Sequence, residues 1–176
     1  MTATGRADGP RTALGRAVFS HLGSKDVVKV VYGSIVGLAL VVALEAHPGT
    51  PTQTFAAVVA TAIAIALAEA FSEFIGIETR ERRLIASREI PGLAADAGAV
   101  AVGAGFPAVF FLLAAVKVID LDTAFTIAKW SGLGLIFAYA WAASRLAGSS
   151  VVTAMLHATV VGAIGVVLIA LKALLH

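Results

Sequence analysis

Apolar stretches long enough to cross a lipid bilayer recur along almost the whole of this sequence. A transmembrane helix needs about 20 consecutive, mostly apolar residues, and residues 54–77 alone supply such a run. Only 14% of the 176 residues are charged and 59% are hydrophobic, whereas a soluble domain has about 25% charged residues. The runs are rich in alanine and leucine and lack the alternation of barrel strands. We therefore expect an all-α integral membrane protein.

Polar turns divide the apolar region into five expected transmembrane helices, at about residues 27–44, 54–77, 93–116, 123–144 and 151–175. These helices form a single membrane domain, residues 27–176, after a polar tail, residues 1–26. One helical face of the tail gathers apolar side chains: Leu14, Ala17, Val18 and Leu22. This pattern predicts a short amphipathic helix on the membrane surface, with a solvated basic tail as the alternative.

Two prolines are expected to shape the helices of this domain. Pro107 lacks a backbone N–H and is expected to kink the third span. The helix of the second span is expected to continue into the charged segment Glu78–Glu89 and to stop at Pro91 and Gly92.

The distribution of lysine and arginine predicts the orientation. With five crossings, ten of these residues fall on the side of the N-terminus, and three fall on the other side: Lys117, Lys129 and Lys172. Because positive residues favour the cytoplasm, we expect the N-terminus in the cytoplasm and the C-terminus outside. Lys129 is expected to extend to the outer interface. Glu45 and His47 are expected in a solvated loop, with an outer vestibule as the alternative.

Two carboxylates inside the second span mark the first candidate site. Glu69 and Glu73 are four residues apart, so they share one helical face, at about 12–14 Å and 6–8 Å from the end of that span. A carboxylate in hydrocarbon costs about 2.5–3.5 kcal/mol on insertion scales and usually faces a bundle interior or a water-filled path. Asp96, in the first turn of the third span, and His157, about 10 Å into the fifth, fall at similar depth on the same side. The five-span topology would let all four residues meet.

These side chains suit two kinds of chemistry. Glu69, Glu73 and His157 offer the mixed oxygen and nitrogen ligands that Fe, Mn, Zn and Co favour. Together with Asp96 they also suit a proton relay, since apposed carboxylates and histidine exchange protons near neutral pH. Each residue has a structural alternative: a hydrogen bond to a neighbouring helix for Glu69, a headgroup contact for Glu73, placement at a helix N-terminus for Asp96, and a satisfied core position for His157.

A GxxxG spacing, formed by Gly33 and Gly37, lies in the first span. Small residues at this spacing let two helices approach closely. We expect these glycines to pack helices together.

The sequence resembles the vacuolar iron transporter family over two short motifs. Residues 31–38, Val-Tyr-Gly-Ser-Ile-Val-Gly-Leu, are similar to that family's Val-Phe-Gly-Ala-Asn-Asp-Gly-Leu. Residues 73–79, Glu-Phe-Ile-Gly-Ile-Glu-Thr, are similar to its Gly-Glu-Tyr-Leu-Ser-Val stretch. The resemblance implies a homodimer with a metal path between subunits, which exchanges cytosolic Fe²⁺ or Mn²⁺ for protons. It matches Glu73 to the family's glutamate in the second span.

Two features depart from that family. Val36 stands where the family has an aspartate in its first span, and a short charged segment replaces the family's glutamate-rich, metal-collecting domain between spans two and three. Glu69 stands where the family often has a methionine ligand. We hypothesise that Glu69 moves the lost carboxylate from the first span to the second.

The expected function is transport of a divalent metal cation (Fe, Mn, Zn or Co), coupled to protons, by a homodimer or higher homo-oligomer in the lipid bilayer. One alternative is an oligomeric cation channel, lined by the helices that carry the GxxxG spacing and with an acidic ring of Glu69 and Glu73. Another is a non-transporting scaffold or partner subunit. No motif indicates an enzyme, a permanently bound cofactor or a nucleic-acid partner, and the absence of cysteine excludes disulfides. The richness in glycine, alanine, arginine and valine indicates a bacterial plasma membrane.

Overall fold

The computed structural model describes residues 26–175, and this part of the chain is helical with no strand. Six helices follow one another: α2 (Asp26–Ala46), α3 (Pro51–Glu81), α4 (Ile90–Gly105), α5 (Ala108–Ala115), α6 (Leu121–Leu146) and α7 (Val151–Leu175). The amphipathic helix expected in the tail lies outside the described residues.

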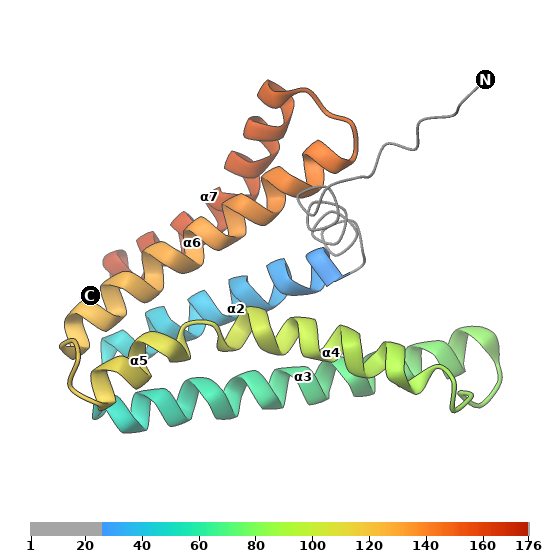
Figure 1. Cartoon of the computed structure of the whole chain (residues 1–176), viewed down its shortest axis with the longest axis horizontal. Helices are drawn as coiled ribbons and strands as arrows, with labels where there is room; N and C mark the ends of the chain where they lie inside the picture. The colour runs from blue at the N-terminus through green and yellow to red at the C-terminus, as the bar shows by residue number, and fades with distance from the viewer. Residues whose placement is uncertain (1–25, 176) are drawn as a thin grey trace, which may run out of the picture.

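The helix α2 is the centre of the arrangement. It packs most extensively on α4, and it also contacts α6, α7 and α3. Figure 1 shows α3 and α4 as one hairpin beside α2, and α6 and α7 as a second hairpin inclined to it. Because α2 separates the two hairpins, each of its faces meets a different partner.

Two helices are long and apolar enough to cross a membrane, at residues Val27–Ala46 and Pro51–Glu81. A third span is formed if α4 and α5 are taken together, since they are bent by 51° at their junction. The helix α7 adds a shorter apolar stretch, Val151–Val167. The protein is therefore membrane-embedded, while the number of five spans stays a prediction.

The bend between α4 and α5 falls at Pro107, as expected from the sequence. Pro107 precedes the first residue of α5 and cannot donate the backbone hydrogen bond that a continuous helix requires. The apolar face continues across the break, and Phe111 of α5 packs edge-to-face on Phe125 of α6 with ring centroids 4.8 Å apart. The ring pair lies in the main buried core, with Val41 of α2 and Val58 of α3.

The expectation that the second helix would run on to Pro91 and Gly92 was wrong. The helix α3 ends at Glu81, because Arg82 adopts a left-handed conformation with φ of 50°. Pro91 instead lies in the first turn of α4, where a missing N–H costs no helical hydrogen bond. Pro91 and Gly92 thus mark the start of α4 and not the end of α3. Because α4 begins at Ile90, Asp96 lies in the second turn of its helix rather than the first.

The two glycines of the GxxxG spacing lie against α4 within the same chain. A Cβ built on Gly37 would stand 2.6 Å from the carbonyl oxygen of Ala104, and one on Gly33 would stand closer still to that of Val100. From the other side, a Cβ on Gly103 would stand 2.8 Å from the backbone nitrogen of Ser34. The backbones of α2 and α4 thus touch, which explains why this is the most extensive helix contact.

Candidate functional site

An ion pair joins α2 to α3 near the beginning of α2. The Lys29 Nζ donates to a carboxylate oxygen of Glu69, and the two side chains are only 21% and 20% exposed. Lys29 is the fourth residue of α2, and Glu69 is near the middle of α3. A charged pair on two apolar helices needs mutual neutralisation, because neither charge is stable alone in hydrocarbon.

The pair also fixes how α2 and α3 are aligned along their axes. Lys29 stands about 4.5 Å from the start of α2, and Glu69 lies beside it. The 31 residues of α3 extend over about 46 Å, more than the roughly 30 Å of a bilayer core. The part of α3 after Glu69 therefore extends past the start of α2. The two helices therefore do not end at the same level.

Glu73 lies one turn further along α3 than Glu69. Its carboxylate accepts a hydrogen bond of 3.3 Å from Arg80 on the same helix, and its side chain is 34% exposed. Glu73 is thus on the same face as Glu69, as its spacing predicts, but it has its own cation. It occupies the more open end of the site.

Asp96 brings a third carboxylate to this region from α4. It is half-buried, and its charge and that of Glu73 both act on Lys29. Of the three carboxylates, Glu69 is the one that bonds to Lys29, and Glu73 and Asp96 lie within electrostatic range of this lysine. Within residues 26–175, Arg80 is the other basic side chain that bonds to one of these carboxylates. The region carries an excess of negative charge.

The structure places His157 on the other side of α2. Its Nδ1 shares a hydrogen bond of 3.1 Å with the Ser144 hydroxyl of α6. His157 and Ser144 line a cavity of about 290 Å³ together with Val27 and Val31 of α2. The carboxylates lie toward α3 and α4, so α2 stands between them and the imidazole.

The four residues expected to meet are thus divided into two groups. Glu69, Glu73 and Asp96 lie together, and His157 lies apart. Within residues 26–175, no group of three or more histidine, aspartate or glutamate side chains has an arrangement that would hold a metal ion. The metal set Glu69, Glu73 and His157 stays a prediction, and its assembly would require the helices to move.

Sequence reasoning missed Lys29 as a member of the site. In the sequence, Lys29 was used only to predict the orientation in the membrane, although a lysine inside an apolar span requires a carboxylate partner. The same signal applies at the other end of α2, where the Lys129 ammonium of α6 donates to both carboxylate oxygens of Glu45 at 2.6 and 2.9 Å. Lys129 therefore turns inward rather than outward to the interface, and Glu45 lies in the last turn of α2 rather than in a loop.

All buried polar side chains in the described part of the chain have a hydrogen-bond partner. Ser34, which lies in the close contact of α2 with α4, donates to the carbonyl oxygen of Val30 at 2.8 Å.

The chain was compared with protein-family models, curated proteins and solved structures. None of the three comparisons finds a match.

Proposed function

We propose that the chain is a membrane transporter of divalent metal cations, coupled to protons, whose working site is the group of carboxylates around Lys29. One observation carries the proposal: a partly buried ion pair, Lys29–Glu69, on two apolar helices, with Glu73 and Asp96 close to it. Ionisable groups inside membrane spans are costly and usually mark ion or proton pathways.

The lysine gives this site a means of exchange. Glu69 is held by the Lys29 ammonium when no other cation is present. A divalent cation that binds Glu69 and Asp96 would replace that ammonium, and protons that bind the carboxylates would release the cation again. One divalent cation and two protons bring the same charge to these two carboxylates. Exchange of one for the other therefore leaves the net charge of the site unchanged, which limits the cost of charge in a medium of low dielectric constant.

The donor set favours one class of metal. Without His157 the available ligands are carboxylate oxygens, which suit Mn²⁺ better than the softer or nitrogen-preferring metals. Among Fe²⁺, Mn²⁺, Zn²⁺ and Co²⁺, we therefore expect Mn²⁺ to be transported best.

The proposed topology keeps the five spans, with α4 and α5 as one bent span and the arginine-rich loop in the cytoplasm. The proposed assembly is a homodimer or higher homo-oligomer in a bacterial plasma membrane. Gly33 and Gly37 are covered by α4, so a second copy would have to use another helix face. A channel lined by these glycines is therefore less favoured.

A second candidate is a non-transporting membrane scaffold. It is favoured by the pairing of three carboxylates with basic side chains: Glu69 with Lys29, Glu73 with Arg80, and Glu45 with Lys129. Such pairs would serve only to hold helices together in a protein that moves no ion.

The test is flux into proteoliposomes of the full chain, with Fe²⁺, Mn²⁺, Zn²⁺ and Co²⁺ offered separately at two pH values. We expect pH-dependent uptake that is lost in Glu69→Gln and in Lys29→Gln/Glu69→Gln, a double variant that leaves no unpaired charge. Glu45→Gln, at the other end of α2, is the matched control and should retain uptake. Absence of flux in the folded wild type would favour the scaffold, and full flux in both Glu69 variants would refute the site.

A further inference from the structure

An open apolar groove runs between α3 and α4 on the outer surface of their hairpin. Its volume is about 700 Å³, and its lining is apolar throughout: Leu67, Phe71 and Phe74 from α3, and Ile90, Leu93 and Ala94 from α4. Leu67 and Phe71 are about two-thirds exposed. This volume lies within the usual range of ligand-binding pockets, so the groove can receive an extended hydrocarbon chain.

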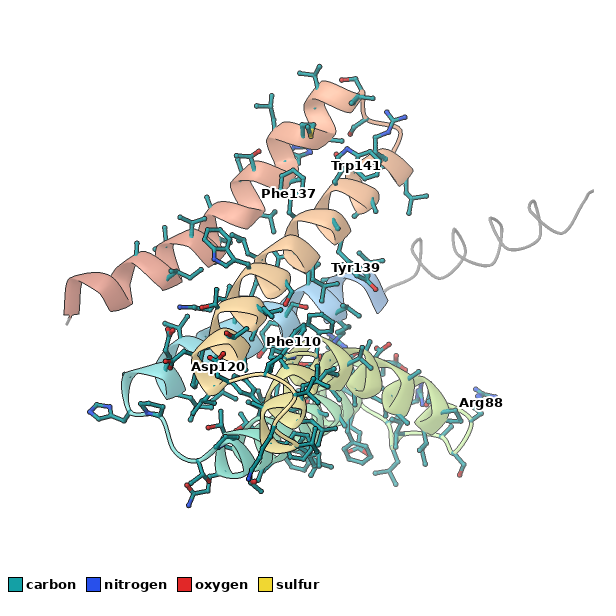
Figure 2. All side chains as sticks on the ribbon, turned by 60° about the vertical axis from the view of Figure 1, so that its left-hand side comes forward. Arg88, Phe110, Asp120, Phe137, Tyr139 and Trp141 are labelled. Carbon is teal, nitrogen blue, oxygen red and sulfur yellow. The ribbon has the colours of Figure 1, made fainter. Side chains whose placement is uncertain are left out.

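One end of the groove lies beside the arginine-rich loop that joins α3 to α4. Arg88 is two residues before Ile90, so its backbone is within about 7 Å of the groove lining. Figure 2 shows Arg88 on this loop, projecting from the end of the hairpin. An apolar channel thus ends where a cationic surface begins.

Internal bonds hold the loop in a defined shape. The Arg83 guanidinium donates to both carboxylate oxygens of Glu89 at 2.9 and 2.6 Å, and Glu89 also accepts from the backbone N–H of Ala86 at 2.8 Å. These bonds bring the end of α3 to the start of α4. The side chains of Arg82, just before the bonded residues, and Arg88, next to Glu89, make no hydrogen bond or ion pair within residues 26–175, and both residues are exposed.

We propose that this hairpin binds one anionic phospholipid, with an acyl chain in the groove and the phosphate between Arg82 and Arg88. Guanidinium groups match the geometry of phosphate oxygens. Basic pockets beside transmembrane helices are typical sites for anionic headgroups.

Charge complementarity favours this occupant over the others. A neutral lipid would fill the groove but would leave both guanidinium groups without a bonded anion. A second copy of the chain, related by two-fold symmetry in the same membrane, would bring an identical arginine-rich loop to the same level. An anionic lipid satisfies the apolar groove and the two arginines together.

The experiment titrates the purified full chain in non-ionic detergent with phosphatidylglycerol, phosphatidylcholine and inorganic phosphate, and follows bound lipid by native mass spectrometry. We expect phosphatidylglycerol to bind more tightly than phosphatidylcholine, and inorganic phosphate not to compete. Each exposed arginine should raise the affinity for phosphatidylglycerol about 5-fold. Arg82→Gln/Arg88→Gln should therefore lower that affinity about 25-fold and leave the affinity for phosphatidylcholine unchanged. Arg145→Gln, in the last turn of α6, is the control for the loss of one positive charge elsewhere in the protein.

A pair of variants on one turn of α4 tests the groove itself. Ala94→Trp fills the groove and should weaken both lipids, whereas Ala95→Trp, which is exposed but outside the groove lining, should weaken neither. Equal binding of the two lipids, or an unchanged affinity in the double arginine variant, would overturn the headgroup site. If the protein forms a dimer in lipid-free detergent, and Ala94→Trp abolishes that dimer while Ala95→Trp does not, the groove would be assigned to a second copy of the chain.

Discussion

Replacing Gly103 by alanine should separate α2 from α4. The new Cβ would lie 2.8 Å from the backbone nitrogen of Ser34, and closer still to the carbonyl oxygen of Val30. Ordinary contact begins at 3.4 Å, so the helices must part by at least about 0.6 Å, the difference between those distances. The clashing atoms belong to a helix backbone, which cannot turn aside as a side chain can.

The expected cost follows from two opposing effects. Overpacking a close contact costs about 1–3 kcal/mol, while alanine is favoured over glycine within a helix by about 0.8–1.0 kcal/mol. For a clash with rigid backbone the first effect should exceed the second. We expect Gly103→Ala to lower the free energy of unfolding by about 1–2 kcal/mol.

Gly98 provides a matched control on the same helix. A Cβ at Gly98 would meet nothing within 4 Å, so Gly98→Ala should leave stability unchanged or raise it by up to about 1 kcal/mol. Both variants can be measured by unfolding in mixed detergent micelles, followed by circular dichroism. Equal shifts for the two variants would refute the inference that α2 and α4 touch through their backbones.

Three further outcomes are expected. Lys29→Met should destabilise the protein by about 3–5 kcal/mol, because it leaves the partly buried carboxylate of Glu69 without a partner. The double variant Lys29→Met/Glu69→Leu should recover most of that loss. Equal stability of the single and double variants, measured by unfolding in micelles, would contradict the pairing. Asp120→Ala should lower the free energy of unfolding by about 1 kcal/mol, because Asp120 accepts from the N–H of Thr123 at 2.7 Å and caps α6. Thermal unfolding measures this loss, and an unchanged stability would contradict the role of Asp120 as a cap. The Arg83 guanidinium and a backbone N–H lower the pKa of Glu89 from 4.5 to about 2. The contribution of Glu89 to loop stability is therefore fully present above about pH 4.5 and lost as the pH falls toward 2. Hydrogen exchange of the loop should accelerate over that interval in the wild type, and a loop in Glu89→Gln that is equally protected at pH 5 would contradict this.

The helical character and most helix positions could be predicted from local pattern. The apolar runs, the polar turns and Pro107 each act over a few residues, and hydrocarbon requires the backbone to bond within one segment. The boundary at Arg82 could not be predicted in this way, because a left-handed arginine is not distinguished by residue type. Pro91 suits both the end of one helix and the start of the next, and only the position of α4 decides between them.

The carboxylate face was also visible in the sequence, since Glu69 and Glu73 share it by spacing alone. The partners of these carboxylates could not be predicted from the sequence. Lys29 is 40 residues from Glu69 along the chain, and the rotation of α2 about its axis decides whether Lys29 meets α3 or faces lipid. The same rotation turns Val27 and Val31 toward His157 and so separates the imidazole from the carboxylates.

The sequence by itself thus determined that this chain is helical, that it lies in a membrane, and that one helical face carries two costly carboxylates. Those properties depend on neighbours a few residues apart. Only the tertiary structure decided that Gly33, Gly37 and Gly103 bring α2 onto α4, that Lys29 joins the carboxylates, and that His157 stands apart. The physical reason is that each helix has a free rotation and a free alignment along its axis, and these are set by packing between segments distant in the sequence.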